Sequence, residues 1–542
     1  MHRRCRLRGP LTGAMLLTAG AAAAAPVPSQ LNPGALQQQQ LQRQRRLERR
    51  KHQPRTQGPV IHGPTPSTHP LGGPPGPHFM LRGVEFNRSH FLSKKTLARI
   101  AKPYVGHEVD FADLRRLVAG INGLYRRRGI ITAQAVLPPQ KIHAGVVRIR
   151  LVEGRVGKVS LQGNTFTRSG YILDRVRLER GAVVDVAKLR DSLVYFNRTN
   201  DIDLKATLRP GARFGLTDVL LQAQEPPRYR LQVFADNEAP ASTGRNEIGA
   251  YLQVHGLAGM GDRLNLYLTK SRGATNGNLS YSIAVNRAGG RAGLSYARNS
   301  IHVINGAYQA LDITGNSRTV LASYSQPLRV AGPWKITAAG SLSRTVSKTY
   351  LAGVFLSDTR VDKLALGLTV ANVAPMQYWT LTQTLAPASA HEAVSDRHLL
   401  LYDGTGRWLR RLNPHWSAVA DGGWQYTGQQ NLPASELFQI GGATTVRGYR
   451  QGIVAGDKGY YLDVELHRRL PWNLDGFAFV DTGAVYTRSA SRTSITGTGI
   501  GASWRWKRRL TLDTDVGYAV NRVIPNQDSY RVDVRLTVHF GR

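Results

Sequence analysis

Tyr530-Arg531-Val532-Asp533-Val534-Arg535-Leu536-Thr537-Val538-His539-Phe540 alternates without interruption between apolar and polar side chains. Because successive side chains of a β-strand point to opposite faces, this segment predicts a strand with one apolar and one polar face. Its eleven residues are also enough for a tilted strand to cross the hydrocarbon core of a bilayer. The pattern is typical of a transmembrane β-barrel strand, with lipid on one side and water on the other.

The same alternation recurs upstream, from Tyr229 onward, in segments of about ten residues separated by Gly, Asn, Asp or Ser. Clear examples are residues 263–270, 461–467 and 503–507. Aromatic residues near segment ends fit interface girdles, and these are Trp334, Trp416 and Tyr518. A soluble β-sandwich or barrel is the alternative, but it tolerates fewer outward Trp, Tyr and Leu side chains. We predict a mainly β protein in which residues 228–542 form a transmembrane antiparallel β-barrel of about 16 strands, an even number as single-chain barrels require.

The first 25 residues predict export. His2 to Arg8 is a positive n-region, Leu11 to Ala25 is apolar, and Ala21 to Ala25 offers an A-x-A-like cleavage site, so residues 1–25 are interpreted as a signal peptide. Cys5, the single cysteine of the sequence, precedes the apolar run, so we expect neither a lipid anchor nor a disulfide. Residue 25 is followed by no apolar run of 18 residues, so a membrane role requires a closed β-barrel.

Two segments of biased composition follow. Residues 26–53 are rich in Gln and Arg, and Ala35 to Lys51 within them consists of good helix formers with few apolar positions. Such a segment is either a disordered tail or a helix that docks in a polar cavity. Residues 54–78 are dense in Pro and Gly and predict an extended linker.

Residues 79–153 and 154–226 predict two small α/β domains in tandem, each with the order β-α-α-β-β. In the first, Asp110 is a plausible helix N-cap, Leu114, Leu117 and Ile121 repeat at helical spacing, and Gly129 ends the helix. The second repeats the order, with helices near 171–178 and 185–197. Each has a small sheet with exposed edges, which suits pairing with an extended peptide.

Composition and motifs exclude several classes of function. Lys and Arg number 72 against 35 Asp and Glu. This excess is typical of nucleic-acid binding, of an anionic membrane surface or of a basic aqueous channel, with plain surface charge as the alternative. No compact basic cluster with interleaved aromatics occurs, so nucleic acid is not an expected partner. No P-loop, H-E-x-x-H or G-x-S-x-G motif occurs, so we expect no catalytic residues, no cofactor and no metal site.

A Gly-rich segment, Gly441 to Arg450, lies between two predicted strands and contains a lone arginine, Arg447. A later strand, Phe477 to Gly483, carries Asp481 among apolar and Gly residues. One arginine and one aspartate in such surroundings predict a fixed ion pair. The pair is either a structural latch alone or a latch that also matters for transport.

Together these features resemble the two-partner secretion transporters of the TpsB type, the haemolysin secretion/activation or ShlB/FhaC/HecB-like family. Val446-Arg447-Gly448-Tyr449 matches the family's V-R-G-Y loop tip, and Phe479-Val480-Asp481-Thr482-Gly483 matches its F-x-D-x-G strand. The ends and turns of two POTRA domains are matched by further motifs: Leu137 to Gln140, Gly145, Val152 to Gly154, Gly163-Asn164, Asn197-Arg198 and Leu208 to Gly211.

The resemblance implies an outer-membrane protein of a Gram-negative bacterium with its POTRA domains in the periplasm. Its partner would be a secreted TpsA-type exoprotein, recognised through an N-terminal secretion domain and passed through the barrel without nucleotide hydrolysis. Outer-membrane lipids and the barrel assembly machinery are the other expected partners. The assembly signal departs from the usual pattern, because Gly541-Arg542 follow the aromatic Phe540.

The resemblance also implies roles for named residues. Ala35 to Lys51 would be a plug helix in the resting lumen, with Asp463 and Glu465 as candidate lumen acidic residues for its arginines. The expected loop latch comprises Val446, Arg447, Gly448, Tyr449, Asp481 and Gly483. Two alternatives remain: an outer-membrane assembly factor of the same superfamily, which shares the Arg-Gly-Tyr loop, and a passive porin or surface-binding protein.

Overall fold

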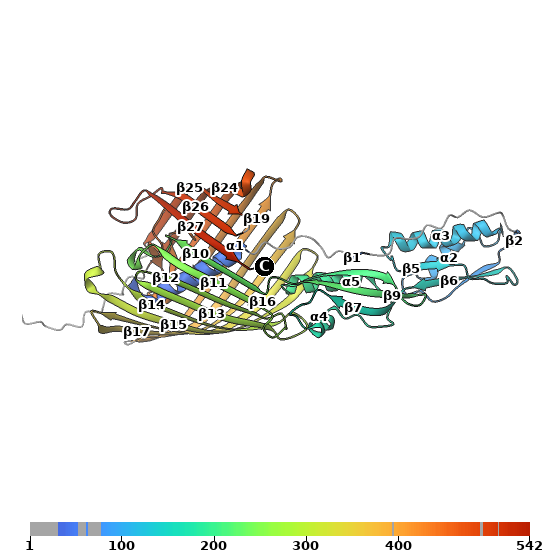
Figure 1. Cartoon of the computed structure of the whole chain (residues 1–542), viewed down its shortest axis with the longest axis horizontal. Coiled ribbons are helices and arrows are strands. Elements are labelled where there is room, and N and C mark those ends of the chain that lie inside the picture. The colour runs from blue at the N-terminus through green and yellow to red at the C-terminus, as the bar shows by residue number, and fades with distance from the viewer. Residues whose placement is uncertain are drawn as a thin grey trace, which may run out of the picture.

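A computed structural model describes residues 31–51, 61–62, 77–392, 395–487, 491–507 and 509–541. The predicted signal peptide and most of the Pro-rich linker lie outside the described residues. A β-barrel forms one end of the molecule, and two α/β units extend from it in line (Figure 1). A helix from the N-terminal region lies inside the barrel.

The barrel is closed and antiparallel, and it contains sixteen strands, as the alternation predicted. Its strands are β10 Tyr229–Asp236, β11 Glu247–His255, β12 Arg263–Ser271, β13 Ala274–Ala284, β14 Arg291–His302, β15 Ile313–Ala331, β16 Trp334–Leu351, β17 Val354–Ala374, β18 Gln377–Glu392, β19 Ser395–Arg411, β20 Trp416–Tyr426, β23 Lys458–Arg469, β24 Leu474–Tyr486, β25 Arg492–Trp506, β26 Leu510–Ala519 and β27 Tyr530–Phe540. The first strand pairs with the last, from Leu231 opposite Phe540 to Asp236 opposite Arg535, so the sheet has no free edge.

Side-chain exposure follows the alternation around the wall. On β27, Val532 is half exposed, whereas Asp533 and Arg535 face the lumen and are buried. Leu294 and Leu342 on other strands are likewise exposed on the outer face. An apolar outer face and a polar inner face are what a barrel in lipid requires. Within the described residues, the longest helices are all too polar or too short to cross a bilayer.

The first α/β unit contains the predicted helices. Its elements are β2 Phe79–Met80, β3 Gly83–Phe86, α2 Lys94–Ala101, β4 Glu108–Val109, α3 Phe111–Arg127, β5 Ala133–Val136 and β6 Val146–Glu153. Asp110 caps α3 in a reciprocal capping box with Asp113, and Leu114, Leu117 and Ile121 fill the core. Residues 79–86 form two short strands, because Leu81 turns into the core and the backbone N–H of Arg82 donates to the carbonyl oxygen of Gly145.

The second unit has the same order of elements. They are β7 Arg155–Gln162, α4 Ser169–Val176, α5 Val186–Thr199, β8 Asp203–Pro210 and β9 Leu216–Gln224. Asp185 caps α5 by accepting hydrogen bonds from two backbone N–H groups. A short strand before the first unit, β1 Ile61–His62, pairs in parallel with β8, so the sheet order is β1-β8-β9-β7 and β7 lies at an edge.

The second unit is bonded to two turns of the barrel and to the start of β16, all on one side. The backbone N–H of Arg168 donates to the carbonyl oxygen of Gly259 (3.0 Å). Tyr195 Oη donates to Ala288 (2.9 Å), and Lys335 Nζ donates to the carbonyl oxygen of Arg198 (2.7 Å). These contacts place the α/β units at one mouth of the barrel and leave the opposite mouth to the long hairpins of β15 to β19.

Candidate functional site in the barrel lumen

The connection between β20 and β23, residues 427–457, folds back into the barrel. It contains the short helix η4 Ala434–Glu436 and a small hairpin, β21 Phe438–Ile440 with β22 Val454–Gly456. Ile440, Val446 and Tyr449 are fully buried and pack against Val485 and Ile495 on the inner wall. The loop is therefore part of the lumen core and not an exposed connection.

Arg447 at the loop tip binds three carboxylates on two adjacent wall strands. Its Nε donates to Asp481 Oδ2 (2.7 Å), and its Nη2 donates to Asp481 Oδ1 (2.8 Å) in a two-pronged contact. The remaining donors reach Asp463 Oδ1 and Glu465 Oε1, both at 2.7 Å. The guanidinium also lies 3.6 Å from the ring centroid of Phe479. Since the side chain is only 2% exposed, its charge is compensated by protein groups and not by bulk water.

Glycines let the loop backbone lie flat on the wall. Gly448 has φ +87°, a conformation that strongly favours glycine. A Cβ on Gly497 would collide with the carbonyl oxygen of Arg447, and one on Gly517 would collide with the backbone nitrogen of Gly448. A Cβ on Gly483 would lie 2.7 Å from the carbonyl oxygen of Tyr460. Glycine is therefore required on both surfaces of this contact.

Tyr449 fixes the far side of the tip. Its Oη lies 2.8 Å from the carbonyl oxygen of Thr496 on β25 and 2.9 Å from the carbonyl oxygen of Asn521. The predicted latch residues Val446, Arg447, Gly448, Tyr449, Asp481 and Gly483 are thus brought together at one place on the inner wall. Their role in transport is a proposal, taken up below.

The N-terminal helix, α1 Pro33–Lys51, occupies the lumen beside this loop (Figure 1). Arg43 is 2% exposed and donates to Asp236 Oδ2 and Glu238 Oε2, both at 2.8 Å, and also to Glu247. Gln37 accepts a hydrogen bond from Ser317 Oγ (2.5 Å). Leu36 packs against Ala274 and Ile301, and the hydrogen bonds of the helix to the wall join polar side chains, which matches its low content of apolar residues.

The acidic residues around Arg43 were missed by the sequence analysis. Asp463 and Glu465 face the lumen, but both form ion pairs with Arg447 of the loop. Arg43 is instead bound by Asp236, Glu238 and Glu247 of the first barrel hairpin. Three acids close together in a strongly basic chain could have indicated a binding site for a cation. The sequence does not identify that cation, because Arg43 lies some two hundred residues away.

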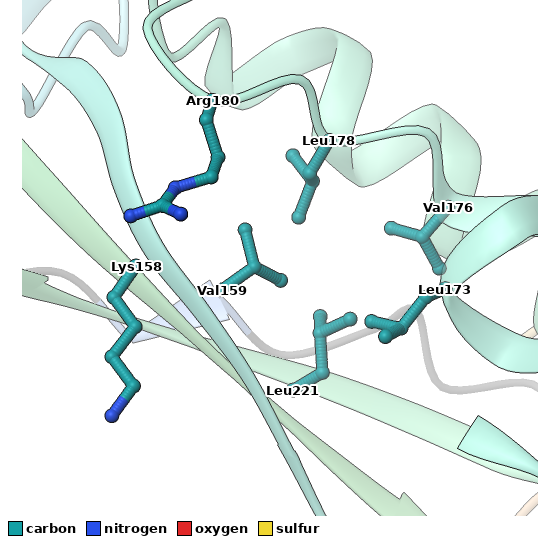
Figure 2. A pocket seen from close by; sticks show the side chains of 7 residues that line it. All are labelled: Lys158, Val159, Leu173, Val176, Leu178, Arg180 and Leu221. Atoms are coloured by element: carbon teal, nitrogen blue, oxygen red, sulfur yellow. The ribbon is translucent and has the colours of Figure 1, made fainter. Parts of the chain in front are cut away.

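A separate cavity of about 490 Å³ lies in the second α/β unit, between the edge strand β7 and α4. Its floor is apolar, and two cations stand at one side of it (Figure 2). The lining residues are Lys158, Val159, Leu173, Val176, Leu178, Arg180 and Leu221. Residues 181–183 bond to the outer edge of β7 at Arg155 and Val156, and past this bridge no described strand pairs with that edge. The described residues also contain no group of three or more His, Cys, Asp or Glu side chains arranged to hold a metal ion.

Comparison with known families matches two models. Residues 215–504, more than half of the chain, match the family described as haemolysin secretion/activation protein ShlB/FhaC/HecB. Residues 79–154 match the ShlB-type POTRA domain. The second match coincides with the first α/β unit, and the first match covers the start of the barrel through β25.

Individual relatives agree with these matches. The chain is 25% identical over 393 residues to the heme/hemopexin transporter protein HuxB of Haemophilus influenzae, covering 69% of each chain. It is 24% identical over 486 residues to the outer membrane transporter CdiB of Dickeya dadantii, covering 82% of this chain and 84% of the relative. Among solved structures, CdiB from Escherichia coli matches 95% of this chain and 100% of its own with a TM-score of 0.66 at 22% identity, a likeness of fold.

Proposed function

The chain belongs to the haemolysin secretion/activation family ShlB/FhaC/HecB, the outer-membrane transporters of two-partner secretion, and from this premise we propose that it secretes one partner exoprotein through its barrel. The exoprotein would be captured in the periplasm by the α/β units, threaded through the lumen in extended form, and released to fold outside. Folding at the far side, and not nucleotide hydrolysis, would supply the direction. The observation that carries the proposal is a closed sixteen-strand barrel whose lumen holds a helix of the same chain through ion pairs and hydrogen bonds.

The edge of β7 and the cavity beside it support a capture site for an extended peptide. An added strand could pair with β7 beyond Val156, whose own backbone groups are already bonded to residues 181 and 182, and alternate side chains would enter the cavity over Val159 and Leu221. Lys158 and Arg180 favour a segment with an acidic residue next to its apolar ones. The opposite edge of the sheet is covered by β1, so β7 is the edge that remains for a partner.

The lumen contents support a transporter at rest. Helix α1 and the Arg447 loop contact each other, since Gln439 Nε2 donates to the carbonyl oxygen of Ala35 (3.4 Å). An extended chain cannot share the lumen with both, so α1 would leave or shift during transport. Polar contacts suit this step, because water can replace them when the helix departs, whereas a buried apolar face would resist exposure.

The capture site can be tested by secretion. The chain would be co-expressed with the exoprotein encoded beside its gene, and released exoprotein would be measured in the medium. We expect Lys158→Glu with Arg180→Glu to reduce release severely while the barrel stays in the membrane. Arg190→Glu on the exposed face of α5 is the matched control. Normal release by the double variant would exclude this cavity as the capture site.

A further inference from the structure

The outer wall of the barrel carries cations that the lumen and the α/β units do not use. They lie on four adjacent strands and are Arg298, Arg318, Arg344, Lys348 and Arg360, here called the outer-wall cation cluster. The residues next to them face inward. Ser317 bonds Gln37 of the lumen helix, and Thr345 is buried against Thr319. Because side chains alternate along a strand, the cations point outward.

Strand register brings these cations together. Arg298 lies directly opposite Arg318, and Val346 is the cross-strand partner of both Arg318 and Arg360. Neighbouring strands are about 4.8 Å apart, so the cluster from β14 to β17 spans about 15 Å. Like charges directly opposite each other destabilise a sheet. Among the described residues, neither Arg298 nor Arg318 has a carboxylate partner, so no described acid offsets this repulsion.

Two carboxylates offset only part of the remaining charge. Asp362 accepts hydrogen bonds from Arg344 Nε (2.5 Å) and lies 3.3 Å from Arg360 Nε. Asp358 lies 3.9 Å from Lys348 Nζ. The cluster therefore keeps an excess of positive charge. Its side chains also remain reachable, since those of Arg344 and Arg360 are 60% and 47% exposed.

The cluster stands at one border of the apolar band. On β14, Leu294 and Tyr296 face outward and Arg298 is the next outward residue, away from the α/β units. The order is the same on the next two strands. Val320 lies nearer the α/β units than Arg318 on β15, and Leu342 lies nearer them than Arg344 on β16. On each of these three neighbouring strands, the first polar side chain beyond the exposed apolar residues is therefore a cation. In a barrel that spans the outer membrane, the polar position next to the apolar band is where acyl chains give way to lipid headgroups.

We propose that the outer-wall cation cluster binds the phosphate groups of lipopolysaccharide, the phosphorylated glycolipid of the outer leaflet. The guanidinium group of an arginine can donate two parallel, charge-assisted hydrogen bonds to the oxygens of one phosphate. A phosphate between Arg298 and Arg318 removes the repulsion between them, and the acyl chains of the same molecule cover Leu294 and Leu342. Free phosphate could use the arginines but not the apolar residues, so the site selects a lipid.

The test measures lipid retained by the full chain, purified from outer membranes in mild detergent and analysed by native mass spectrometry. Diphosphorylated lipid A is the probe. We expect Arg298→Gln with Arg318→Gln to lower its binding about ten-fold, the effect of losing one or two charged hydrogen bonds. Arg318→Gln alone should give an intermediate loss. The control, Arg329→Gln with Arg468→Gln, removes two exposed arginines at the opposite end of the strands and should bind as the unchanged protein does.

Two further arms identify the source of the phosphate. Dephosphorylated lipid A should bind at least about ten-fold more weakly, and an excess of inorganic phosphate should leave bound lipid in place. Equal binding of both forms of lipid A, or unchanged binding by a folded Arg298→Gln/Arg318→Gln protein, would overturn the proposal. Displacement by inorganic phosphate would also overturn it, by showing a general anion site. Heat-modified migration on gels confirms that each variant barrel is folded.

Discussion

Asp463 and Asp481 lie directly opposite each other on β23 and β24, both buried, and face the same lumen. Two adjacent carboxylates repel each other across a sheet. Here the guanidinium of Arg447 bonds both, at 2.7 Å to each. A residue on a long loop therefore neutralises a charge pair that belongs to the wall, which joins the position of the loop to the stability of these two strands.

Arg447→Ala should leave three buried carboxylates without their cation. Breaking a buried pair from one side costs about 3–5 kcal/mol, and less if water enters the lumen. We expect a lower unfolding temperature on heat-modified gels and reduced secretion, with the barrel still inserted. Asp463→Asn with Asp481→Asn in the same chain should recover part of the stability, because two of the three carboxylates lose their charge while Glu465 keeps its contact with His467 (2.9 Å). Wild-type secretion by Arg447→Ala would refute a role of the latch in transport.

Gly517→Ala should displace the loop tip. Its Cβ would collide with the backbone of Gly448, which cannot move away without breaking the Arg447 contacts. Gly340→Ala is the control, since the nearest atom to its Cβ would be a leucine methyl group at 3.6 Å. Protease accessibility of residues 441–450 in intact cells should rise in the first variant and not in the second. Equal protection of both would contradict the close packing of the tip on the wall.

Arg43→Gln should loosen α1 in the lumen. The variant removes the cation that Asp236, Glu238 and Glu247 share. Arg535 still lies 3.2 Å from Asp236, but one cation then faces three acids, and their excess negative charge opposes the packed helix. Single-channel recordings in planar bilayers should show more frequent open currents than the unchanged protein. Gln42→Ala, on the exposed face of the same helix, should behave as the unchanged protein. Identical currents for Arg43→Gln would show that other contacts retain the helix.

Glu225 should make the second α/β unit sensitive to acid. Burial opposes its charged form, but hydrogen bonds from Thr165 and Thr167 outweigh that effect and hold the pKa of Glu225 below 4.5. A lowered pKa in the folded state means stability that is present above pH 4.5 and is lost as pH falls through the folded value. Unfolding temperatures of the unchanged protein and of Glu225→Gln should therefore differ near neutral pH and converge in acid. A constant difference would contradict this.

The alternation of side chains was enough to predict the barrel. In segments such as 263–270 and 530–540, side chains alternate with a period of two residues, which assigns one set to the lipid face and the other to the lumen. The structure has the sixteen barrel strands that this alternation predicted. Helices in the α/β units were equally predictable, because Asp110 and Asp185 cap periodic apolar runs. These are local properties, since a strand face or a helix cap depends on residues within a few positions of one another.

Partners across the lumen were harder to predict. The pair of Arg447 with Asp481 followed from two short motifs, but the acids that hold Arg43 did not, and neither did the cations that gather on the outer wall. Strand register decides such neighbours: Arg298 and Arg318 are twenty residues apart in sequence and become adjacent only because β14 and β15 pair in one register of several that the pattern allows. By itself the sequence determined which residues face lipid and which face the lumen, because a strand alternates. Only closure of the barrel decided which charges meet, because closure sets the register of every strand relative to the helix and loop inside.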